Sequence, residues 1–179
     1  MDDRAIVDAV LAGDRDAFRL IVERESAPVY RACLRILGRA HDAEEAAQDG
    51  FVIAYRSLAS FRGDGSLGGW LMRIATREAF RRLRRGSTVD LAAAAHVRES
   101  RPDADPVATA IDGERQARVR AAVAALAEPY REVVALRFFG ELSLNEIAAA
   151  TGRPLPTVKT QLRRGLDRLR GGLGEELAS

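Results

Sequence analysis

The sequence predicts an all-α protein made of two small helical domains joined by a linker. Apolar residues recur at helical spacing along most of the chain, and no segment shows the alternation of a half-buried strand. Hydrophobic residues make up 47% of the 179, enough to form cores and too many for a disordered chain. Residues 86–106 break the pattern with Gly, Ser, Asp and two prolines, so we expect them to link domains at 1–85 and 107–175.

The first domain is expected to contain three helices, at residues 16–37, 42–58 and 70–85. Pro28 either kinks the first helix or starts a second segment within it. Asp42 followed by Glu45 resembles a capping box, which would start the second helix there. Residues 59–69 contain four glycines and predict a loop. Arginines cluster at the end of the third helix, between residues 77 and 85, where cations suit the negative end of the helix dipole.

The second domain is expected to contain four helices, at residues 107–126, 129–140, 143–152 and 155–170. Ser143 and Glu146 have the spacing of a capping box, and Gly152 suits the left-handed position that ends a helix. An inward Ala148, a turn at Gly152 and an inward Val158 have the spacing of a helix-turn-helix. An ordinary helical hairpin would show the same spacing.

The last helix, "LPTVKTQLRRGLDRLR", is basic on the faces that its apolar stripe leaves free. A helix that enters the DNA major groove presents its N-terminal half to the base edges, and Arg can bind guanine in bidentate fashion. The simpler alternative is a solvated basic face. The candidate DNA contacts are Thr157, Lys159, Thr160, Gln161, Arg163 and Arg164.

Two surfaces of the first domain allow both a structural and a functional interpretation. The helix 42–58 is expected to have an exposed face that is either solvated or binds a partner. It contains Glu45, Gln48, Asp49 and Arg56. Trp70 is either a core anchor or an aromatic platform for an unpaired base. The glycine-rich loop before it is either slack chain or the rim of a pocket that accepts a flipped base.

Composition excludes several classes of site. The formal net charge is only +2, so the basic character is local, and the single cysteine, Cys33, excludes an internal disulfide and a cysteine zinc cluster. No nucleophile–base set, metal cluster or phosphate loop occurs, so we expect no catalytic residue, metal or cofactor. No apolar run approaches the roughly 20 residues of a membrane span, and the acidic N-terminus lacks a signal peptide's features. We therefore expect no membrane insertion and a cytoplasmic location.

Three segments together resemble the extracytoplasmic-function (ECF) sigma factors, the minimal two-domain branch of the bacterial sigma-70 family. They are "DAEEAAQDGFVIAYRSL", "FRGDGSLGGWLMRIATREAFRRLRR" and "LAEPYREVVALRFFGELSLNEIAAATGRPLPTVKTQLRRGLDRLR". The match runs from about Ala17 to Arg170 and is broken only at the linker. It implies that residues 1–85 are sigma region 2, a helical bundle, and that residues 107–175 are sigma region 4, a helix-turn-helix domain.

The resemblance also implies a function: binding core RNA polymerase at its clamp and flap, recognising promoter −35 and −10 elements, and helping to melt the −10 region. It implies polymerase contacts at Glu45, Gln48 and Asp49, and −35 contacts on the basic helix named above. The implied −10 contacts are Phe61, Arg62, Gly63, Asp64, Trp70, Arg73, Arg77, Arg81 and Arg84. An anti-sigma factor is a further expected partner.

Five positions depart from the family pattern. Ala127 stands where Pro commonly follows Leu, with Pro129 two residues later, so we expect a shifted helix start. Arg77 stands where Asn is usual and Arg81 where Asp is usual, and both add positive charge beside the predicted −10 region. Gln161 replaces a common Arg, which alters the expected −35 specificity. Gly165 replaces a usual Ala, so we expect a looser recognition helix.

Two other functions compete with this interpretation. A stand-alone helix-turn-helix regulator would use its first domain for sensing or dimerisation, and binding to duplex −35 DNA without polymerase would favour it. The polymerase-like face of residues 42–58 argues against it. An enzyme is the other alternative, and its support would have to come from a turnover assay.

Overall fold

The computed structural model of the chain describes residues 2–89 and 106–176, and the regular structure within these ranges is entirely helical. The all-α prediction is therefore confirmed. The linker was predicted at residues 86–106. Residues 86–89 instead continue the preceding helix and residue 106 begins the next, while residues 90–105 lie outside the described residues. In chain order the elements are α1 (Asp3–Leu11), α2 (Arg15–Leu37), α3 (Ala40–Ser57), the 3₁₀ turn η1 (Leu58–Ser60), α4 (Leu67–Val89), α5 (Pro106–Ala125), α6 (Tyr130–Phe138), α7 (Leu144–Thr151) and α8 (Leu155–Glu176).

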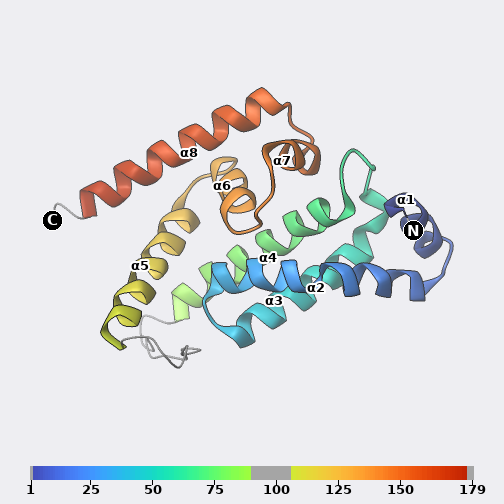
Figure 1. Cartoon of the computed structure of the whole chain (residues 1–179), viewed down its shortest axis with the longest axis horizontal. Coiled ribbons are helices and arrows are strands. Elements are labelled where there is room, and N and C mark those ends of the chain that lie inside the picture. Colours follow the sequence, from blue (N-terminus) through green and yellow to red (C-terminus); the bar gives the residue numbers. More distant parts are fainter. Residues whose placement is uncertain (1, 90–105, 177–179) are drawn as a thin grey trace.

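Helices α1 to α4 form the first domain, in which α2, α3 and α4 all pack against one another (Figure 1). The Asp14 carboxylate caps α2 by accepting hydrogen bonds from the backbone N–H groups of Asp16 and Ala17. Helix α2 continues through Pro28 to Leu37 as one element. Its buried face carries aliphatic side chains that meet small and aliphatic residues of α3 and α4. The largest fully buried side chains of this core are Ile21, Val29, Cys33, Ile36, Leu58, Leu67 and Leu71.

Helix α1 was not anticipated from the sequence, although Ile6, Val7 and Val10 have helical spacing and are all buried. Asp3 fixes it to two other elements. One carboxylate oxygen accepts a hydrogen bond from Arg24 of α2 at 2.7 Å, and the other accepts one from the backbone N–H of Leu67 at 2.7 Å. The start of α4 is thereby joined to α1 and α2.

The predicted capping box at Asp42 is wrong. Helix α3 begins at Ala40 with Arg39 as its N-cap residue, so Asp42 lies inside the first turn. The Glu45 side chain, which the box would have used, instead accepts a hydrogen bond from Arg82 of α4 at 2.7 Å. A tertiary ion pair has replaced the local cap.

The second domain places α8 across α6, with α7 leading into it. The capping box of α7 is present: the Ser143 hydroxyl accepts from the backbone N–H of Glu146, and the Glu146 carboxylate accepts from that of Ser143. Gly152 ends α7 at φ 66°, as predicted. Ile147 and Val158, on either side of this turn, are fully buried. The helix-turn-helix prediction is confirmed.

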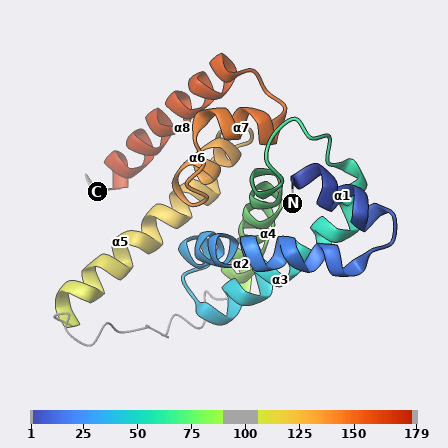
Figure 2. The ribbon, with the colours of Figure 1, turned by 45° about the vertical axis from the view of Figure 1, so that its right-hand side comes forward.

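The two domains pack directly against each other. Figures 1 and 2 both show α6 and α7 lying over α4, and we call this contact the domain seam. The rings of Phe80 and Phe139 meet across it with centroids 5.9 Å apart. At Gly140 the approach is so close that a Cβ would lie 2.9 Å from Cγ of Met72. Sequence periodicity, which reports on single helices, could not predict this contact.

Candidate nucleic-acid interface

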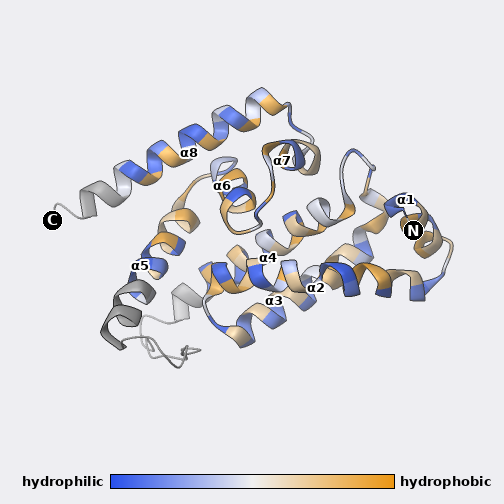
Figure 3. Ribbon diagram, in the orientation of Figure 1, coloured by the Kyte–Doolittle hydropathy of each residue, from blue (hydrophilic) through white to orange (hydrophobic). Residues whose placement is uncertain are grey.

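The N-terminal half of α8 presents a polar and basic row to solvent. Thr157, Lys159, Arg163 and Arg164 are exposed, whereas Val158 between them is fully buried. Figure 3 shows α8 as predominantly hydrophilic along one edge of the molecule. The predicted −35 residues therefore lie on one accessible helix that the turn at Gly152 holds in place.

The two remaining predicted −35 residues are half-buried. The Thr160 hydroxyl donates a hydrogen bond to the backbone carbonyl of Pro156 at 3.0 Å, within α8 itself. The Gln161 amide oxygen lies 3.5 Å from a guanidinium nitrogen of Arg153, just after the turn. Both side chains are thus partly committed to the helix-turn-helix, and four exposed residues remain as the accessible DNA-facing row.

Gly165 lies on the buried side of α8. A Cβ at this position would lie 2.8 Å from Cγ2 of Val134 and 3.5 Å from Cβ of Tyr130 on α6. The sequence suggested that this glycine loosens the recognition helix. The structure gives it another role, because the missing side chain allows α8 to approach α6 closely.

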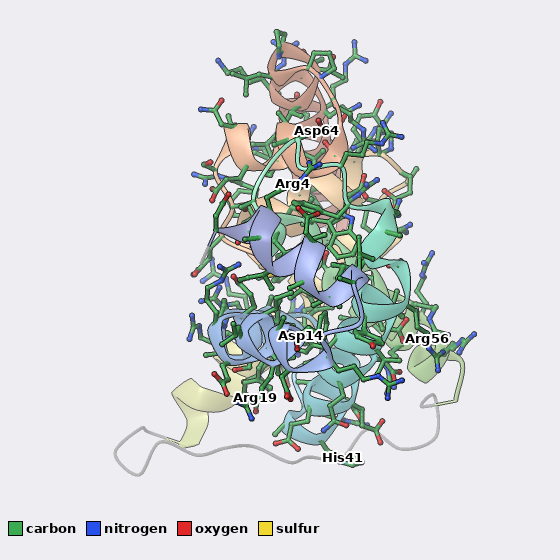
Figure 4. The ribbon with its side chains drawn as sticks, turned by 90° about the vertical axis from the view of Figure 1, so that its right-hand side faces the viewer. Arg4, Asp14, Arg19, His41, Arg56 and Asp64 are labelled. Atoms are coloured by element: carbon green, nitrogen blue, oxygen red, sulfur yellow. The ribbon has the colours of Figure 1, made fainter. Side chains whose placement is uncertain are left out.

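The predicted −10 loop projects from the first domain between η1 and α4. Arg62, Gly63 and Asp64 are exposed, and Figure 4 shows Asp64 beside Arg4 of α1. Phe61 and Trp70 flank the loop with ring centroids 5.7 Å apart, and both pack partly against the core. Trp70 therefore has the anchoring contacts that the structural interpretation required, and its half-exposed ring remains next to the loop.

The arginines of α4 are paired with carboxylates. Arg73 and Arg77 both contact Glu132 of α6, at 2.8 Å and 3.0 Å. Arg81 forms a two-point ion pair with Glu78 one turn earlier. The two unusual arginines, Arg77 and Arg81, are thus each paired with a carboxylate, but Glu132 also pairs with Arg153 and Glu78 also pairs with Arg82, so an excess of positive charge remains. Arg84, the last predicted −10 residue, is exposed.

A cavity of about 230 Å³ opens at the domain seam beside these arginines. Arg77, Arg81 and Arg84 line it from α4, and Arg131 lines it from α6. Glu128 and Glu132 supply the opposing charge. The predicted −10 helix thus faces the second domain along its basic end.

The predicted polymerase contacts lie together on α3. Gln48 is exposed, and Glu45 and Asp49 both accept hydrogen bonds from Arg82 of α4. These hydrogen bonds, first of all the one to Asp49, raise the pKa of Arg82 despite partial burial. Arg82 therefore holds both carboxylates in a defined orientation on an accessible surface. Exposed Val52 and Ile53 continue that surface along the helix.

Sequence reasoning missed three residues that organise these surfaces: Arg82, Glu132 and Arg153. Each makes its decisive contacts with residues more than 20 positions away, such as the 59-residue separation of Arg73 and Glu132. Glu132 carried one weak signal, since a carboxylate directly precedes the buried run Val133 to Leu136.

Two kinds of feature are absent from the described residues. Within residues 2–89 and 106–176, no group of three or more His, Cys, Asp or Glu side chains is placed to hold a metal ion. Among the same residues, no helix is both long and apolar enough to cross a membrane.

Comparison with known proteins agrees with this geometry. The sigma-70 region 2 family matches residues 21–88, and the sigma-70 region 4 family matches residues 116–169. The ECF RNA polymerase sigma factor SigW of Bacillus subtilis is 34% identical over 170 residues, covering 90% of this chain and 91% of SigW. The RNA polymerase sigma-H factor of Pseudomonas aeruginosa is 32% identical over 171 residues, covering 90% and 89%.

Solved structures share the fold. The structure of CnrH in complex with the cytosolic domain of CnrY matches with a TM-score of 0.59 and 23% identity, over 97% of both chains. The sigma factor RpoE of Bartonella quintana, in complex with the anti-sigma factor NepR, matches with a TM-score of 0.53 and 20% identity, over 88% of this chain and 96% of RpoE. The chain belongs to the ECF sigma factors of the sigma-70 family, which direct promoter-specific initiation of transcription.

Proposed function

We propose that this chain binds core RNA polymerase through α3 and directs it to promoters through α8 and α4. The observation that carries the proposal is the exposed row Thr157, Lys159, Arg163 and Arg164 on a helix fixed by a buried helix-turn-helix core. Such a helix can enter the major groove, where arginines read guanine and the neighbouring cations hold phosphates. In this role the protein recruits polymerase and catalyses no reaction of its own.

The −10 element is assigned to the loop after η1 and to the arginines of α4. Exposed Arg62 and Asp64 are available to an unpaired base, and the half-exposed ring of Trp70 can support it by stacking. Arg73, Arg77, Arg81 and Arg84 supply positive charge for the DNA backbone, and the first three need release from their carboxylate partners. Melting is then assisted by trapping a base that has left the stack.

The domain boundaries follow the same division. Residues 1–85 form the polymerase-binding and −10 unit, 86–106 the linker, and 107–175 the −35 unit, which also contacts the polymerase flap. The family matches at 21–88 and 116–169 support this division. We assign the protein to the cytoplasm, where its polymerase and promoter DNA are found. An anti-sigma factor is a proposed partner, since RpoE of Bartonella quintana is seen in complex with one.

The polymerase assignment is tested by co-elution with sigma-free core RNA polymerase on a sizing column. Asp49→Lys should abolish or strongly weaken co-elution, because it reverses a charge on the α3 face and places a second cation beside Arg82. Glu23→Lys, the same charge change on the exposed side of α2, is the matched control and should co-elute normally. Equal co-elution of both variants would exclude the α3 face as the polymerase contact. Binding to duplex −35 DNA without polymerase would favour a stand-alone regulator.

A further inference from the structure

We propose that Glu132 holds the free protein in a closed, inactive arrangement by binding arginines that the promoter requires. Glu132 lies on α6 of the second domain, and its side chain is only 2% exposed. One carboxylate oxygen accepts a hydrogen bond from Arg73 Nε at 2.8 Å and lies 3.0 Å from Arg77 Nε, and both arginines come from the first domain. The other oxygen accepts one from Arg153 at 2.6 Å. We call these four side chains the Glu132 clasp.

Within the clasp, the Glu132 carboxylate binds the arginines in the way that a DNA phosphate would bind them. Carboxylates and phosphates both bind guanidinium groups through charge-assisted hydrogen bonds, so one excludes the other. Arg73 and Arg77 are assigned to the −10 DNA, and in the closed protein both are directed at Glu132. Arg73 also donates a hydrogen bond to the backbone carbonyl of Ala150 on α7, at 3.3 Å. DNA that binds Arg73 and Arg77 therefore has to displace Glu132 from them.

In the closed arrangement the two domains are too close together to bind both promoter elements at once. The −10 and −35 elements are separate stretches of one duplex, and positions a single helical turn apart along B-form DNA are already about 34–36 Å from each other. In the closed protein Arg73 of the first domain and Arg153 of the helix-turn-helix contact the same carboxylate, within 2.8 Å. The domains must therefore separate before both elements are bound at once, and separation breaks the clasp.

A buried carboxylate suits a contact that has to open. A well-packed apolar residue at position 132 would stabilise a permanent interface at least as well as an ion pair. It would also leave an apolar surface in water after opening. Glu132 and its arginines can instead be rehydrated, so both the closed and the open states are compatible with water. Another polar link between the domains, from Arg35 of α2 to Glu141 at 2.7 Å, is also an ion pair that water can replace.

The test measures the distance between the domains in the free, full-length protein by fluorescence energy transfer. Dyes are attached to cysteines that replace exposed Ala59 and Asn145, one in each domain. Cys33 stays unlabelled because it is buried and burial raises the pKa of its thiol to about 12. Glu132→Gln should lower transfer efficiency and tighten binding of a single-stranded oligodeoxynucleotide about tenfold, as the fraction of open molecules rises.

Two further variants complete the test. Glu114→Gln removes the same charge from an exposed residue of α5 in the second domain, away from the seam cavity, and it should change neither reading. Arg77→Ala removes one of the arginines of the clasp and should also lower transfer efficiency. The Arg77 side chain is 58% exposed, so this variant serves even where Glu132→Gln fails to fold. Unchanged transfer in folded Glu132→Gln or in Arg77→Ala would overturn the proposal. So would tighter DNA binding in Glu132→Gln and Glu114→Gln alike without a change in transfer, since the loss of negative charge alone would then explain the tighter binding.

The inference rests on the proposed function in one respect: closure inactivates the protein only if Arg73 and Arg77 bind promoter DNA. The distance between the domains is measured without polymerase, so its outcome is separate from that of the co-elution experiment. A protein that opens on loss of Glu132 but never binds polymerase would keep the clasp and lose the proposed function.

Discussion

Gly165 shows how one missing methyl group can decide the packing of two helices. In an isolated helix, Ala at this position would be preferred over Gly by about 1 kcal/mol. In the folded domain, the space that the methyl would fill is already taken by Val134 of α6. Helix propensity alone predicts that Ala at this position stabilises the protein, and the tertiary contact reverses the sign of that effect on stability.

Gly165→Ala should consequently destabilise the second domain by about 1–3 kcal/mol, the usual cost of overpacking a core. Urea unfolding of the full chain, followed by circular dichroism, measures the effect. Gly171→Ala on the same helix is the control, because a Cβ there would meet nothing within 4 Å. It should stabilise the protein slightly, by up to about 1 kcal/mol. Similar effects of the two substitutions would mean that α8 does not approach α6 as closely as described.

At the scale of the element, α8 combines two faces with different tasks. Val158 and Gly165 face the domain core, while Lys159, Arg163 and Arg164 face solvent. Farther along, the Arg168 guanidinium stacks over the ring of Tyr130 at 3.9 Å and ties the helix to α6. The first half of the helix is thus free to bind DNA because the buried face and the second half are anchored.

Arg164→Ala should reduce promoter use by an amount that depends on the −35 sequence. A bidentate guanine contact is worth about 1–3 kcal/mol of discrimination, so the preferred −35 sequence should lose most and altered sequences little. In vitro transcription from a panel of −35 variants measures this. Arg170→Ala, in the last part of the helix where Arg170 pairs with Asp167, is the control and should leave the preference unchanged. Uniform loss across the panel would make Arg164 a phosphate contact.

At the scale of the whole molecule, the domain seam couples the surfaces assigned to the two promoter elements. Burial alone would raise the pKa of Glu132, but the hydrogen bond from Arg73 and the charges of Arg73, Arg77 and Arg153 outweigh it. The pKa of this carboxyl group therefore lies below its ordinary value of 4.5. The ionised carboxylate is favoured in the closed state, which links closure to pH.

The closed state should therefore be fully favoured above about pH 4.5 and should weaken as the pH falls through the lowered pKa. Transfer efficiency between the labelled domains, measured from pH 7 downward, should drop below that pH in the wild-type protein. Glu132→Gln lacks the titrating group and should show a smaller pH-dependent change, which corrects for the titration of exposed carboxylates. Identical pH profiles for the two proteins would show that Glu132 does not control the seam.

Features that arise within one helix or one turn were predictable from the amino-acid sequence. Helical periodicity gave the two all-α domains, the pattern Ser143 to Glu146 gave the capping box, and Gly152 gave the left-handed turn. These features were predictable because their interacting residues lie within a few positions of one another. The row of polar and basic residues on α8 followed for the same reason, since side-chain direction repeats with the helical period.

The pairing of charged side chains, in contrast, depends on how the helices pack in three dimensions. Arg82 binds Glu45 and Asp49, and Glu132 collects Arg73 and Arg77, across separations of 33 to 59 residues. In a chain with 28 basic and 26 acidic residues, many other pairings would satisfy the same composition. The choice among these pairings depends on how the helices pack. That packing is set by the shapes of the buried side chains and by the close approach of helices at small residues, not by the charges. The closed arrangement of the two domains belongs to this second class of feature.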